Sequence, residues 1–447
     1  MNDNDTIAAV ATAPGRGAVG IVRVSGPLVP ALATQLLGRL PPARVATFAQ
    51  FRAADGTVLD SGLALYFPAP HSFTGEHVLE LQGHGGSVVT DLLLERFLQI
   101  GCRLAQPGEF TERAFHNDKL DLAQAEGIAD LIDATSRAAA RAAQRTLRGE
   151  FSARVTALDA ALKHLRMYVE AAIDFPEEEV DFLNDAQLDE NLRHVFEEFD
   201  ALMRATRRGV ALSEGLRVVL AGAPNVGKSS LMNALAGEDV AIVTAIPGTT
   251  RDVLRQSVKI AGFTVNLADT AGLRESADAI EREGMQRARR EMVGADQVLL
   301  VLEAGGALPD AAELQSLPTD VPVTWVFNKI DVTGEPARLE AQATPPRVYL
   351  SATRGQGVDL LRTHLASQAG LADPEEGAFT ARRRHLAALE QACIHVDAAA
   401  STLRGGEGFE LFAEELRLAQ QQLATITGVY GSEELLSDIF RSFCIGK

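Results

Sequence analysis

The sequence is poor in cysteine and contains no long apolar run, and both absences bear on where the protein works. Its three cysteines, Cys102, Cys393 and Cys444, are scattered, show no metal-ligand spacing and cannot all pair with one another. No apolar stretch approaches the roughly 20 residues that a bilayer-spanning helix needs, and no basic-then-apolar signal opens the chain. We therefore expect a cytoplasmic protein that is neither exported nor embedded in a membrane.

Positive charge is also scarce. The 447 residues include 42 Lys and Arg against 60 Asp and Glu, which gives a net charge of −18. Because nucleic acids attract proteins through neutralised phosphates, this balance excludes attraction by the whole surface, and any RNA contact must use a local basic patch. The candidate clusters, which are more often solvated helix faces, are Arg204/Arg207/Arg208, Arg287/Arg289/Arg290 and Arg382–Arg384.

The remaining composition is that of an ordinary soluble protein, 46% hydrophobic and 23% charged, in a chain long enough for roughly three domains. Short β-type runs alternate with helical stretches up to residue 118 and predict an α+β domain. The next stretch is rich in Ala, Leu, Arg and Glu and repeats its apolar residues every three or four positions, which predicts long helices. We expect an α+β domain at 1–118, helical parts at 119–212 and 372–447, and a nucleotide domain inserted between them at 213–371.

The stretch GAPNVGKSS, residues 222–230, fits the phosphate-binding pattern G-x-x-x-x-G-K-[ST]. An apolar strand at 216–221 precedes it and a helical run follows it, so backbone N–H groups and the positive end of the helix dipole point at one place. Lys228 would reach the terminal phosphates, and the Ser229 hydroxyl would hold Mg²⁺. An ordinary glycine turn is the disfavoured alternative. The loop residues assigned to the nucleotide are Asn225, Val226, Gly227, Lys228, Ser229 and Ser230.

Strands and helices alternate from residue 216 to about 369 and predict a mostly parallel sheet that binds ligands at the carboxyl ends of its strands. Asp331 in NKID can accept two N–H bonds from guanine, so it favours GTP over ATP. Thr250 would add its hydroxyl to Mg²⁺ while the terminal phosphate is present, and Asp269 would lie near the water shell of the metal. The further nucleotide-binding residues at these strand ends are Thr244, Ala245, Ile246, Pro247, Gly248, Thr249 and Thr250; Asp269, Thr270, Ala271 and Gly272; Asn328, Lys329 and Asp331; and Ser351, Ala352 and Thr353.

Hydrolysis in this chain needs another residue to orient the attacking water, because Leu273 stands where GTPases of the Ras kind carry a water-orienting Gln. Asn225 could help to bind a monovalent cation, and Glu281 could orient water. From the residues alone, a turn residue and a solvated helix face are the preferred interpretations of these two. A solvent-facing charge is likewise preferred for Arg23 in GIVRVSG and for Glu80 in HVLELQGHGG.

The chain resembles the MnmE (TrmE) family of tRNA-modification GTPases over its full length. The motifs that carry the resemblance are GIVRVSG, HVLELQGHGG, NDKLDLAQAEGIADLID, IPGTTRD, DTAGLRE and the terminal FCIGK. The resemblance implies an α/β P-loop GTPase domain inserted into an all-α helical domain and preceded by an α+β N-terminal tetrahydrofolate-binding domain. It also implies potassium-dependent hydrolysis at G domains that dimerise, with Glu281 and Lys228 as catalytic residues. The K⁺ ligands that it implies are Asn225, Thr244, Ile246 and Thr249.

The same resemblance implies a homodimer that forms through the N-terminal domain and binds a 5,10-methylene- or 5-formyl-tetrahydrofolate. The residues implied at that site are Arg23, Glu80, Lys119 and Lys447. A carboxylate such as Glu80 suits the amidine-like edge of a pterin, and basic side chains suit a carboxylate tail. Cys444 is by default a small buried hydrophobe, but its family setting leaves a catalytic role in one-carbon transfer open.

The implied partner is the FAD- and NADH-dependent flavoprotein MnmG, in a heterotetramer or a larger complex. Together the two would place an aminomethyl or carboxymethylaminomethyl group at C5 of the wobble uridine of certain tRNAs. A ribosome-assembly GTPase without modification chemistry is an alternative, although it predicts an appended basic RNA-binding domain. A folate-binding regulatory module with a degenerate GTPase is disfavoured by intact Lys228, Ser229, Thr250 and Asp269.

Overall fold

The computed structural model describes residues 5–174, 186–237, 255–260, 263–269, 289, 291–310, 314–315, 317–371, 377–405, 408–430, 433–443 and 446. The chain divides into two compact units, Met1–Ala129 with Gln420–Lys447, and Asp130–Ala419. The four segments expected from the sequence, with their three boundaries, are not the same as these two units and stay a prediction.

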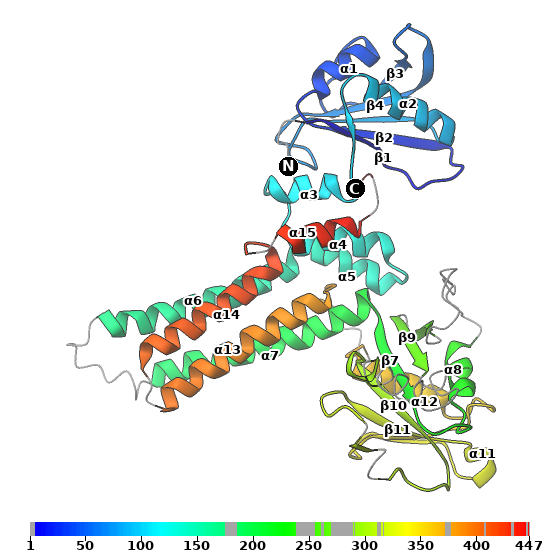
Figure 1. Ribbon diagram of the computed structural model, residues 1–447, viewed down its shortest axis with the longest axis vertical. Coiled ribbons are helices and arrows are strands. Elements are labelled where there is room, and N and C mark those ends of the chain that lie inside the picture. The colour runs from blue at the N-terminus through cyan, green and yellow to red at the C-terminus, as the bar shows by residue number, and fades with distance from the viewer. Residues whose placement is uncertain are drawn as a thin grey trace, which may run out of the picture. The chain divides into compact units, whose positions relative to one another are not determined.

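The first unit is built on a six-stranded sheet with the strand order β3-β4-β5-β2-β1-β6 (Figure 1). Neighbouring strands are antiparallel, except that β1 and β6 are parallel. The strands and the two helices that pack on this sheet are β1 (Ile7–Val10), β2 (Val19–Ser25), α1 (Val29–Leu37), β3 (Thr47–Arg52), β4 (Val58–Phe67), β5 (Val78–His84), α2 (Ser87–Gln99) and β6 (Arg103–Leu104).

Alternation of side chains along the strands gives this sheet two different faces. Val22 and Val24 of β2 join the buried apolar core beneath α1 and α2. Arg23 lies between them and therefore points to the opposite face, where Phe110 belongs to a second, smaller apolar cluster. Arg23 is also the cross-strand partner of Glu80 on β5, so the two charges share that face.

Helix α3 (Glu109–His116) is held to the N-terminal sheet by a network of ion pairs. The carboxylate of Glu109, which is only 2% exposed, lies 3.0 Å from a guanidinium nitrogen of Arg113 and 2.6 Å from one of Arg103. Arg113 also contacts Glu76 at 3.0 Å and Asp5 at 2.5 Å. Because each buried charge has an opposite partner, the network fixes the position of α3 at the sheet.

The C-terminal helix α15 (Glu433–Arg441) packs within the first unit, against α3 and α4 (Leu122–Asp133). Phe440 and Phe443 join Leu122 in a buried apolar cluster. Gly108, just before α3, has a φ of +72°, and a Cβ at this position would lie 2.3 Å from the carbonyl oxygen of Phe440. Only glycine permits so close an approach.

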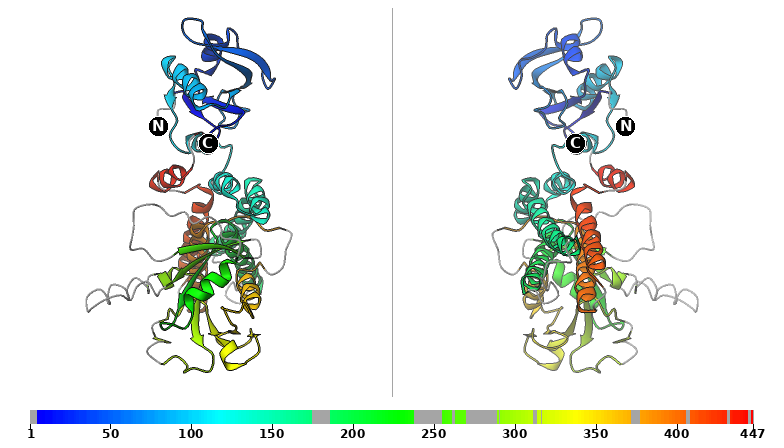
Figure 2. Two further views of the ribbon diagram at one scale, coloured as in Figure 1. Left: turned by 90° about the vertical axis from the view of Figure 1, so that its right-hand side faces the viewer. Right: turned by 90° about the vertical axis from the view of Figure 1, so that its left-hand side faces the viewer.

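The second unit begins with long helices, as the three- and four-residue apolar spacing predicts. In α7, Val195, Phe199 and Leu202 are buried, and in α13 Leu389 and Val396 are buried. Helix α7 packs on α6 and α13, and α5 packs on α6 and α7 (Figures 1 and 2). The helices are α5 (Arg137–Leu147), α6 (Glu150–Asp174), α7 (Ala186–Ser213) and α13 (Arg383–Gly405). Helix α14 (Phe409–Thr427) begins in this unit and ends in the first.

The nucleotide domain is a seven-stranded sheet with the order β12-β13-β11-β10-β7-β9-β8. The five strands from β13 to β9 in this order are parallel, and the two edge strands β8 and β12 are antiparallel to their neighbours. The elements of this domain are β7 (Leu216–Ala221), α8 (Lys228–Ala236), β8 (Arg255–Ile260), β9 (Phe263–Asp269), β10 (Gln297–Glu303), β11 (Val323–Asn328), α11 (Ile330–Thr333), β12 (Arg338–Glu340), β13 (Arg347–Tyr349) and α12 (Val358–Gln368).

Helices α7 and α13, which pack on each other, flank the nucleotide domain in the sequence, because α7 ends at Ser213 and α13 begins at Arg383. This confirms the predicted architecture, in which an α/β domain is inserted between helices and an α+β domain precedes both. Among the described residues, no helix is long and apolar enough to cross a membrane.

Candidate functional site

The phosphate-binding loop leaves the end of β7 and turns into α8 with three unusual backbone positions. Gly222 has a φ of +134° and Gly227 one of +98°, and a Cβ at these positions would lie 2.3 Å from the carbonyl oxygen of Val301 and 2.2 Å from Nδ2 of Asn328. Asn225 has a φ of +63°, a left-handed conformation that Asn tolerates better than most residues. The sequence therefore places its two glycines where the loop approaches β10 and β11.

Lys228 closes this loop through its side chain. Its ammonium donates to the carbonyl oxygens of Gly222 at 2.9 Å and Ala223 at 2.8 Å, and the residue is only 5% exposed. Ser229, the next residue, is exposed in the first turn of α8, whereas Ser230 is half-buried. The loop thus presents a buried cation, an accessible hydroxyl and the N-terminus of a helix together, which suits a polyphosphate with a bound Mg²⁺.

Asn328 connects two loops at this edge of the sheet. Its Nδ2 donates to the carbonyl of Val226 at 2.9 Å, and its Oδ1 accepts from the backbone N–H of Ala352 at 3.0 Å. The side chain is buried, with 3% exposure. Because both polar ends of the amide are paired inside the protein, Asn328 fixes the phosphate-binding loop and the 351–353 loop relative to each other.

Asp331 is the second residue of the short helix α11, and its side chain contacts the 351–353 loop. The Ser351 hydroxyl donates to its Oδ1 at 2.6 Å, and Nε of Arg354 lies 3.5 Å from Oδ2. The hydrogen bond from Ser351 lowers the pKa of the Asp331 carboxyl below its usual value. Asp331 is therefore held as an oriented carboxylate, the state that accepts two N–H bonds from a guanine edge.

Three further predicted residues lie at this edge of the sheet: Lys329, Asp269 and Thr353. Lys329 has a left-handed backbone with a φ of +67°, and its ammonium lies 3.1 Å from Oε2 of Glu303 at the end of β10. Asp269 ends β9 and its backbone lies opposite Leu220 of β7. Thr353 Oγ1 lies 3.3 Å from the Ser351 hydroxyl.

Many of the predicted residues fall outside the described part of the chain. These are Thr244, Ala245, Ile246, Pro247, Gly248, Thr249 and Thr250 of the switch loop, Thr270, Ala271, Gly272 and Leu273 after β9, and Glu281, Cys444 and Lys447. Their predicted roles in binding Mg²⁺, K⁺, water and folate stay predictions. Asn225 lies in the described part of the chain, but the other three proposed K⁺ ligands do not. Its role as a K⁺ ligand therefore also stays a prediction.

A second polar site lies on the N-terminal sheet, on the face opposite α1 and α2. Nε of Arg23 lies 2.9 Å from Oε1 of Glu80, and one Nη donates to the carbonyl of Gly446 at 3.3 Å. The guanidinium carbon lies 5.9 Å from the ring centre of Phe73 and 5.7 Å from that of Phe110. The residues alone favour solvent-facing charges for Arg23 and Glu80, and this prediction is wrong. The two side chains form a partly buried pair and are 23% and 16% exposed.

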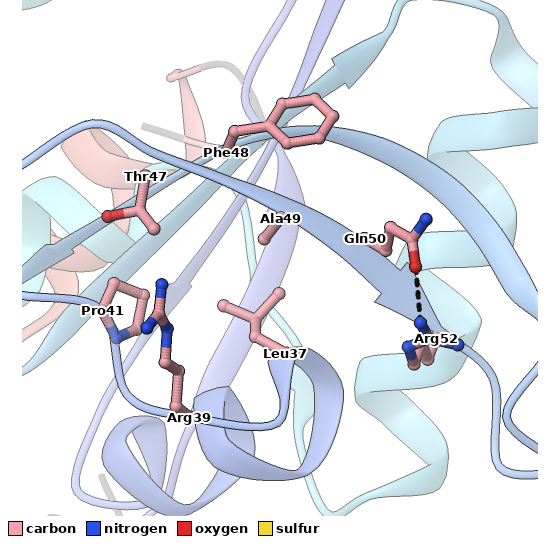
Figure 3. Close-up of a pocket in the computed structure, with 8 residues that line it drawn as sticks. All are labelled: Leu37, Arg39, Pro41, Thr47, Phe48, Ala49, Gln50 and Arg52. Carbon is pink, nitrogen blue, oxygen red and sulfur yellow. Dashed lines mark hydrogen bonds between the residues drawn. The ribbon is translucent and has the colours of Figure 1, made fainter.

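The third predicted residue of this site, Lys119, has an exposed side chain just after α3, and its backbone N–H donates to Ala114. No contact of its side chain with Arg23 or Glu80 occurs among the described residues. A surface hollow of about 320 Å³ beside the edge strand β3 is separate from both predicted sites (Figure 3). It is lined by Leu37, Arg39, Pro41, Thr47, Phe48, Ala49, Gln50 and Arg52.

Four side-chain roles were not evident from the sequence. The bond from the Ser351 hydroxyl to Asp331 and the bridge that Asn328 forms between two loops join residues that are distant in the sequence. Arg354 and Phe110 carried no motif that could identify them. The position of Arg354, three residues after Ser351, is the feature of the sequence that could have indicated its contact with Asp331. No local pattern indicates which strand Phe110 packs beneath.

Comparisons with known proteins match two family models to nearly the whole chain. A family model described as the MnmE helical domain matches residues 122–444, and one described as the GTP-binding protein TrmE N-terminus matches residues 6–119. Solved structures with similarity include the G domain of the T. maritima FeoB iron transporter, at 27% identity over 34% of this chain and 98% of that chain, with a TM-score of 0.27. An Aquifex aeolicus Era variant bound to GDP and AlF4⁻ is 24% identical over 40% of this chain and 67% of that chain, with a TM-score of 0.26.

Proposed function

The chain belongs to the MnmE (TrmE) family and is a TrmE-type GTPase, and from this premise we propose that it uses GTP hydrolysis to modify tRNA. Its product is an aminomethyl or carboxymethylaminomethyl group at C5 of the wobble uridine of certain tRNAs. It acts in the cytoplasm as a homodimer with a flavin- and NADH-dependent partner of the MnmG type, and it takes the carbon from a tetrahydrofolate.

The double hydrogen bond of Asn328 is the observation that carries the GTP-binding part of this proposal. It holds the loop that contains Lys228 and the loop that contains Ser351 at the same edge of one parallel sheet. Phosphate and guanine are the two ends of one ligand, so a site for GTP needs both loops held at a fixed separation. The oriented carboxylate of Asp331 then selects guanine, because adenine leaves it without a donor.

Among the described residues, the exposed hydroxyl of Ser229 suits Mg²⁺ and the side chain of Asn225 is available to K⁺, while the other proposed ligands lie outside the described part of the chain. Ser229 and Thr250 are the proposed Mg²⁺ ligands, and the metal would neutralise negative charge on the phosphates. Asn225, Thr244, Ile246 and Thr249 are the proposed K⁺ ligands, and Glu281 orients the attacking water. Lys228 supplies a fixed positive charge beside the phosphates, since the loop carbonyls already hold its ammonium.

The pair of Arg23 and Glu80 supports the folate part of the proposal. Glu80 can accept from the amidine-like edge of a pterin, while the guanidinium of Arg23 fixes the carboxylate by a charge-assisted hydrogen bond. Phe73 and Phe110 flank the guanidinium and offer flat apolar surfaces to a ring system. Lys119 and Lys447 are the proposed contacts of the glutamate tail, and the role of Cys444 in one-carbon transfer is part of the same proposal.

The deciding experiment is mass analysis of wobble uridines from a strain that lacks this chain. We expect the C5 substituent to disappear, to return with the wild-type chain and to stay absent with Lys228→Ala, which removes the phosphate-binding cation. An unchanged nucleoside profile in the deletion strain would instead favour the ribosome-assembly switch.

The potassium proposal has a separate test, which is GTP turnover by the purified chain in KCl and in NaCl at equal ionic strength. We expect turnover to be strongly faster in KCl, with Asn225→Ala reducing the difference between the two salts. Equal rates in both salts would remove the proposed roles of Asn225 and the switch loop while leaving GTP binding intact.

A further inference from the structure

Helix α5, Arg137–Leu147, together with Arg148 at its C-terminal cap, carries a row of arginines that the fold does not use. Arg137, Arg141 and Arg148 are exposed, and none of them makes a side-chain hydrogen bond or an ion pair with another described residue. The basic cluster at the start of α13, in contrast, has acidic partners, in the pairs of Arg382 with Asp130 and Arg383 with Asp296. The row on α5 is therefore available for a ligand.

The geometry of the helix puts these three side chains on one face. At about 100° per residue, Arg137, Arg141 and Arg148 lie within about 40° of one another around the axis and span about 16 Å along it. The opposite face is the one that packs, through the buried residues Ala139, Ala142, Ala143 and Thr146. This row is called the α5 arginine face below.

The composition of α5 works against the helix as an isolated element. The 11 residues contain no acidic side chain. Arg137 and Arg141 are four residues apart, where like charges repel, and both lie near the N-terminus, where the helix dipole disfavours cations. The Ser136 hydroxyl caps the helix by accepting from the N–H of Ala139 at 3.1 Å, but it offsets only part of this repulsion. An anion bound along the α5 arginine face would relieve it.

The surroundings of the α5 arginine face favour RNA as that anion. A protein partner would need apolar anchors at the centre of its contact, and the α5 side chains that flank the arginines are Ala138, Ala140 and Gln144, none of which is a large apolar group. An anionic membrane would need large apolar side chains facing outward on the same helix, and α5 buries small residues toward the protein instead. Guanidinium groups alone, in a row, match the phosphates of a nucleic acid backbone.

The positive surface also extends toward the nucleotide domain. Lys259 of β8 donates to the carbonyl of Thr135, two residues before Arg137, at 3.0 Å. Thr135 also lies 3.3 Å from Thr264 of β9 through their hydroxyls. A strand of RNA on the α5 arginine face would therefore lie close to the hairpin that forms one edge of the GTPase sheet.

We propose that the α5 arginine face is a docking surface for the phosphate backbone of RNA. The identity of that RNA as a tRNA rests on the proposed function. With a net charge of −18, the chain cannot attract RNA over its whole surface, so a concentrated basic face gives it a defined point of contact. Such contacts position the RNA and carry no sequence information, which agrees with a protein that leaves base recognition to another site.

The test compares three variants of the full-length chain with the wild type for binding of a fluorescently labelled tRNA transcript. The first variant is Arg137→Gln/Arg141→Gln/Arg148→Gln, and the second replaces the same residues by Lys. The control is Arg39→Gln/Arg193→Gln/Arg417→Gln, which removes the same number of exposed or partly exposed charges elsewhere. Both Gln variants change the net charge from −18 to −21 (−18 − 3).

We expect the α5 Gln variant to bind tRNA at least about tenfold more weakly at roughly 100 mM salt, and the slope of log K against log salt to fall by roughly 2 to 3. The control should stay within about twofold of the wild type, and the Lys variant should keep most of the slope because it keeps the charges. GTP turnover should be unchanged in all three, since α5 contributes nothing to the nucleotide loops.

Several results would overturn the proposal. These are a wild type that does not bind tRNA, an α5 Gln variant that binds as the wild type does, and an equal loss in the control. Polyglutamate or anionic vesicles that compete with tRNA as strongly as unlabelled tRNA would assign the surface to another class of partner. The nucleoside profile tests the proposed function separately, because a chain that modifies wobble uridine with a neutral α5 face would contradict only the docking surface.

Discussion

The side-chain amide of Asn328 donates to the backbone carbonyl of Val226 at 2.9 Å, although the two residues are 102 positions apart in the chain. The same amide accepts from the N–H of Ala352. The loop that is expected to hold phosphate thus depends on a residue of the loop that is expected to hold guanine. We therefore expect a change at one end of the proposed nucleotide site to affect the other through this buried side chain.

Replacing Asn328 by Ala is expected to weaken GTP binding by about 1–3 kcal/mol, roughly 5- to 150-fold, because the Val226 carbonyl and the Ala352 N–H lose a buried partner. Titration with a fluorescent GTP analogue measures this loss. Asn328→Asp is the matched comparison, since it keeps the acceptor for Ala352 but puts a carboxylate against the Val226 carbonyl. If Asn328→Ala binds GTP normally, the two loops do not depend on each other.

Asp331→Asn is expected to lower the affinity for GTP by at least about 100-fold and to raise that for XTP. The Asn amide can donate to the C2 oxygen of xanthine but cannot accept both guanine N–H groups. Competition binding with GTP, XTP and ATP measures the change. Ser351→Ala is the control that keeps the Asp331 carboxylate but removes its 2.6 Å hydrogen bond, together with the weaker 3.3 Å contacts of the Ser351 hydroxyl within its own loop, and we expect it to cost about fivefold in GTP affinity without a gain for XTP.

Arg23→Ala is expected to weaken binding of 5-formyl-tetrahydrofolate by at least about tenfold, because a charge-assisted hydrogen bond contributes about 1.5–3 kcal/mol. GTP turnover should be unchanged. Isothermal calorimetry with the folate measures the effect, and Glu80→Gln tests the carboxylate in the same pair. The comparison variant is Arg52→Ala, an exposed arginine of the same sheet. Equal folate affinity in Arg23→Ala and the wild type would remove the Arg23 site.

Arg383 is expected to hold the nucleotide domain to the start of α13. Its guanidinium makes bonds of 2.8 and 2.7 Å to the two carboxylate oxygens of Asp296, and its Nε lies 3.1 Å from Glu214. These hydrogen bonds raise the pKa of Arg383, so the pair stays charged. Arg383→Ala should destabilise the unit by about 2–3 kcal/mol, since two carboxylates lose their partner.

The measurement for Arg383 is the midpoint of thermal unfolding of the full chain, which we expect to fall by several degrees. Arg193→Ala serves as the control, because Arg193 forms an exposed pair with Glu197 that contributes at most about 1 kcal/mol. A smaller shift for Arg383→Ala than for Arg193→Ala would contradict the proposed role.

His364 predicts a pH dependence in the nucleotide domain. The residue is 3% exposed, and its Nε2 lies 2.9 Å from the Thr324 hydroxyl, which in turn accepts from Gln297. Burial lowers the pKa of His364 below its ordinary value of 6.5 because the charged imidazole is desolvated. The unfolded state therefore binds a proton first as the pH falls. The stability that depends on neutral His364 is complete above pH about 6.5 and decreases below it.

Amide hydrogen exchange of α12 at pH 7.5 and 5.5, corrected for the intrinsic rates, measures this effect. Local opening should become easier at the lower pH, by at most about 1.4 kcal/mol for each pH unit. His364→Gln cannot take up a proton and should remove the difference, while His84→Gln, at an exposed position, should not. A pH dependence that survives in His364→Gln would assign the effect to another group.

The sequence by itself determined the features that depend on neighbouring residues. The glycines, lysine and serine of residues 222–230 are contiguous, so a strand, a tight loop and a helix N-terminus follow from local conformational preference. The apolar spacing in the stretch after residue 118 likewise predicted long helices, of which α6 is one, and the alternation of strands and helices predicted the parallel sheet. The arginines of α5 stand at helical spacing in the sequence, but the sequence does not show whether they face solvent.

Tertiary structure alone decided which distant residues meet. The pairing of Arg23 with Glu80 depends on β2 lying beside β5, and the bond from Asn328 to Val226 depends on the positions of β7 and β11 in one sheet. Local preference does not encode the order of strands, because any strand of the right length can pair with several others. The exposure of Arg137, Arg141 and Arg148 was settled in the same way, since only the packing of α5 on α6 and α7 fixes which face of the helix remains open.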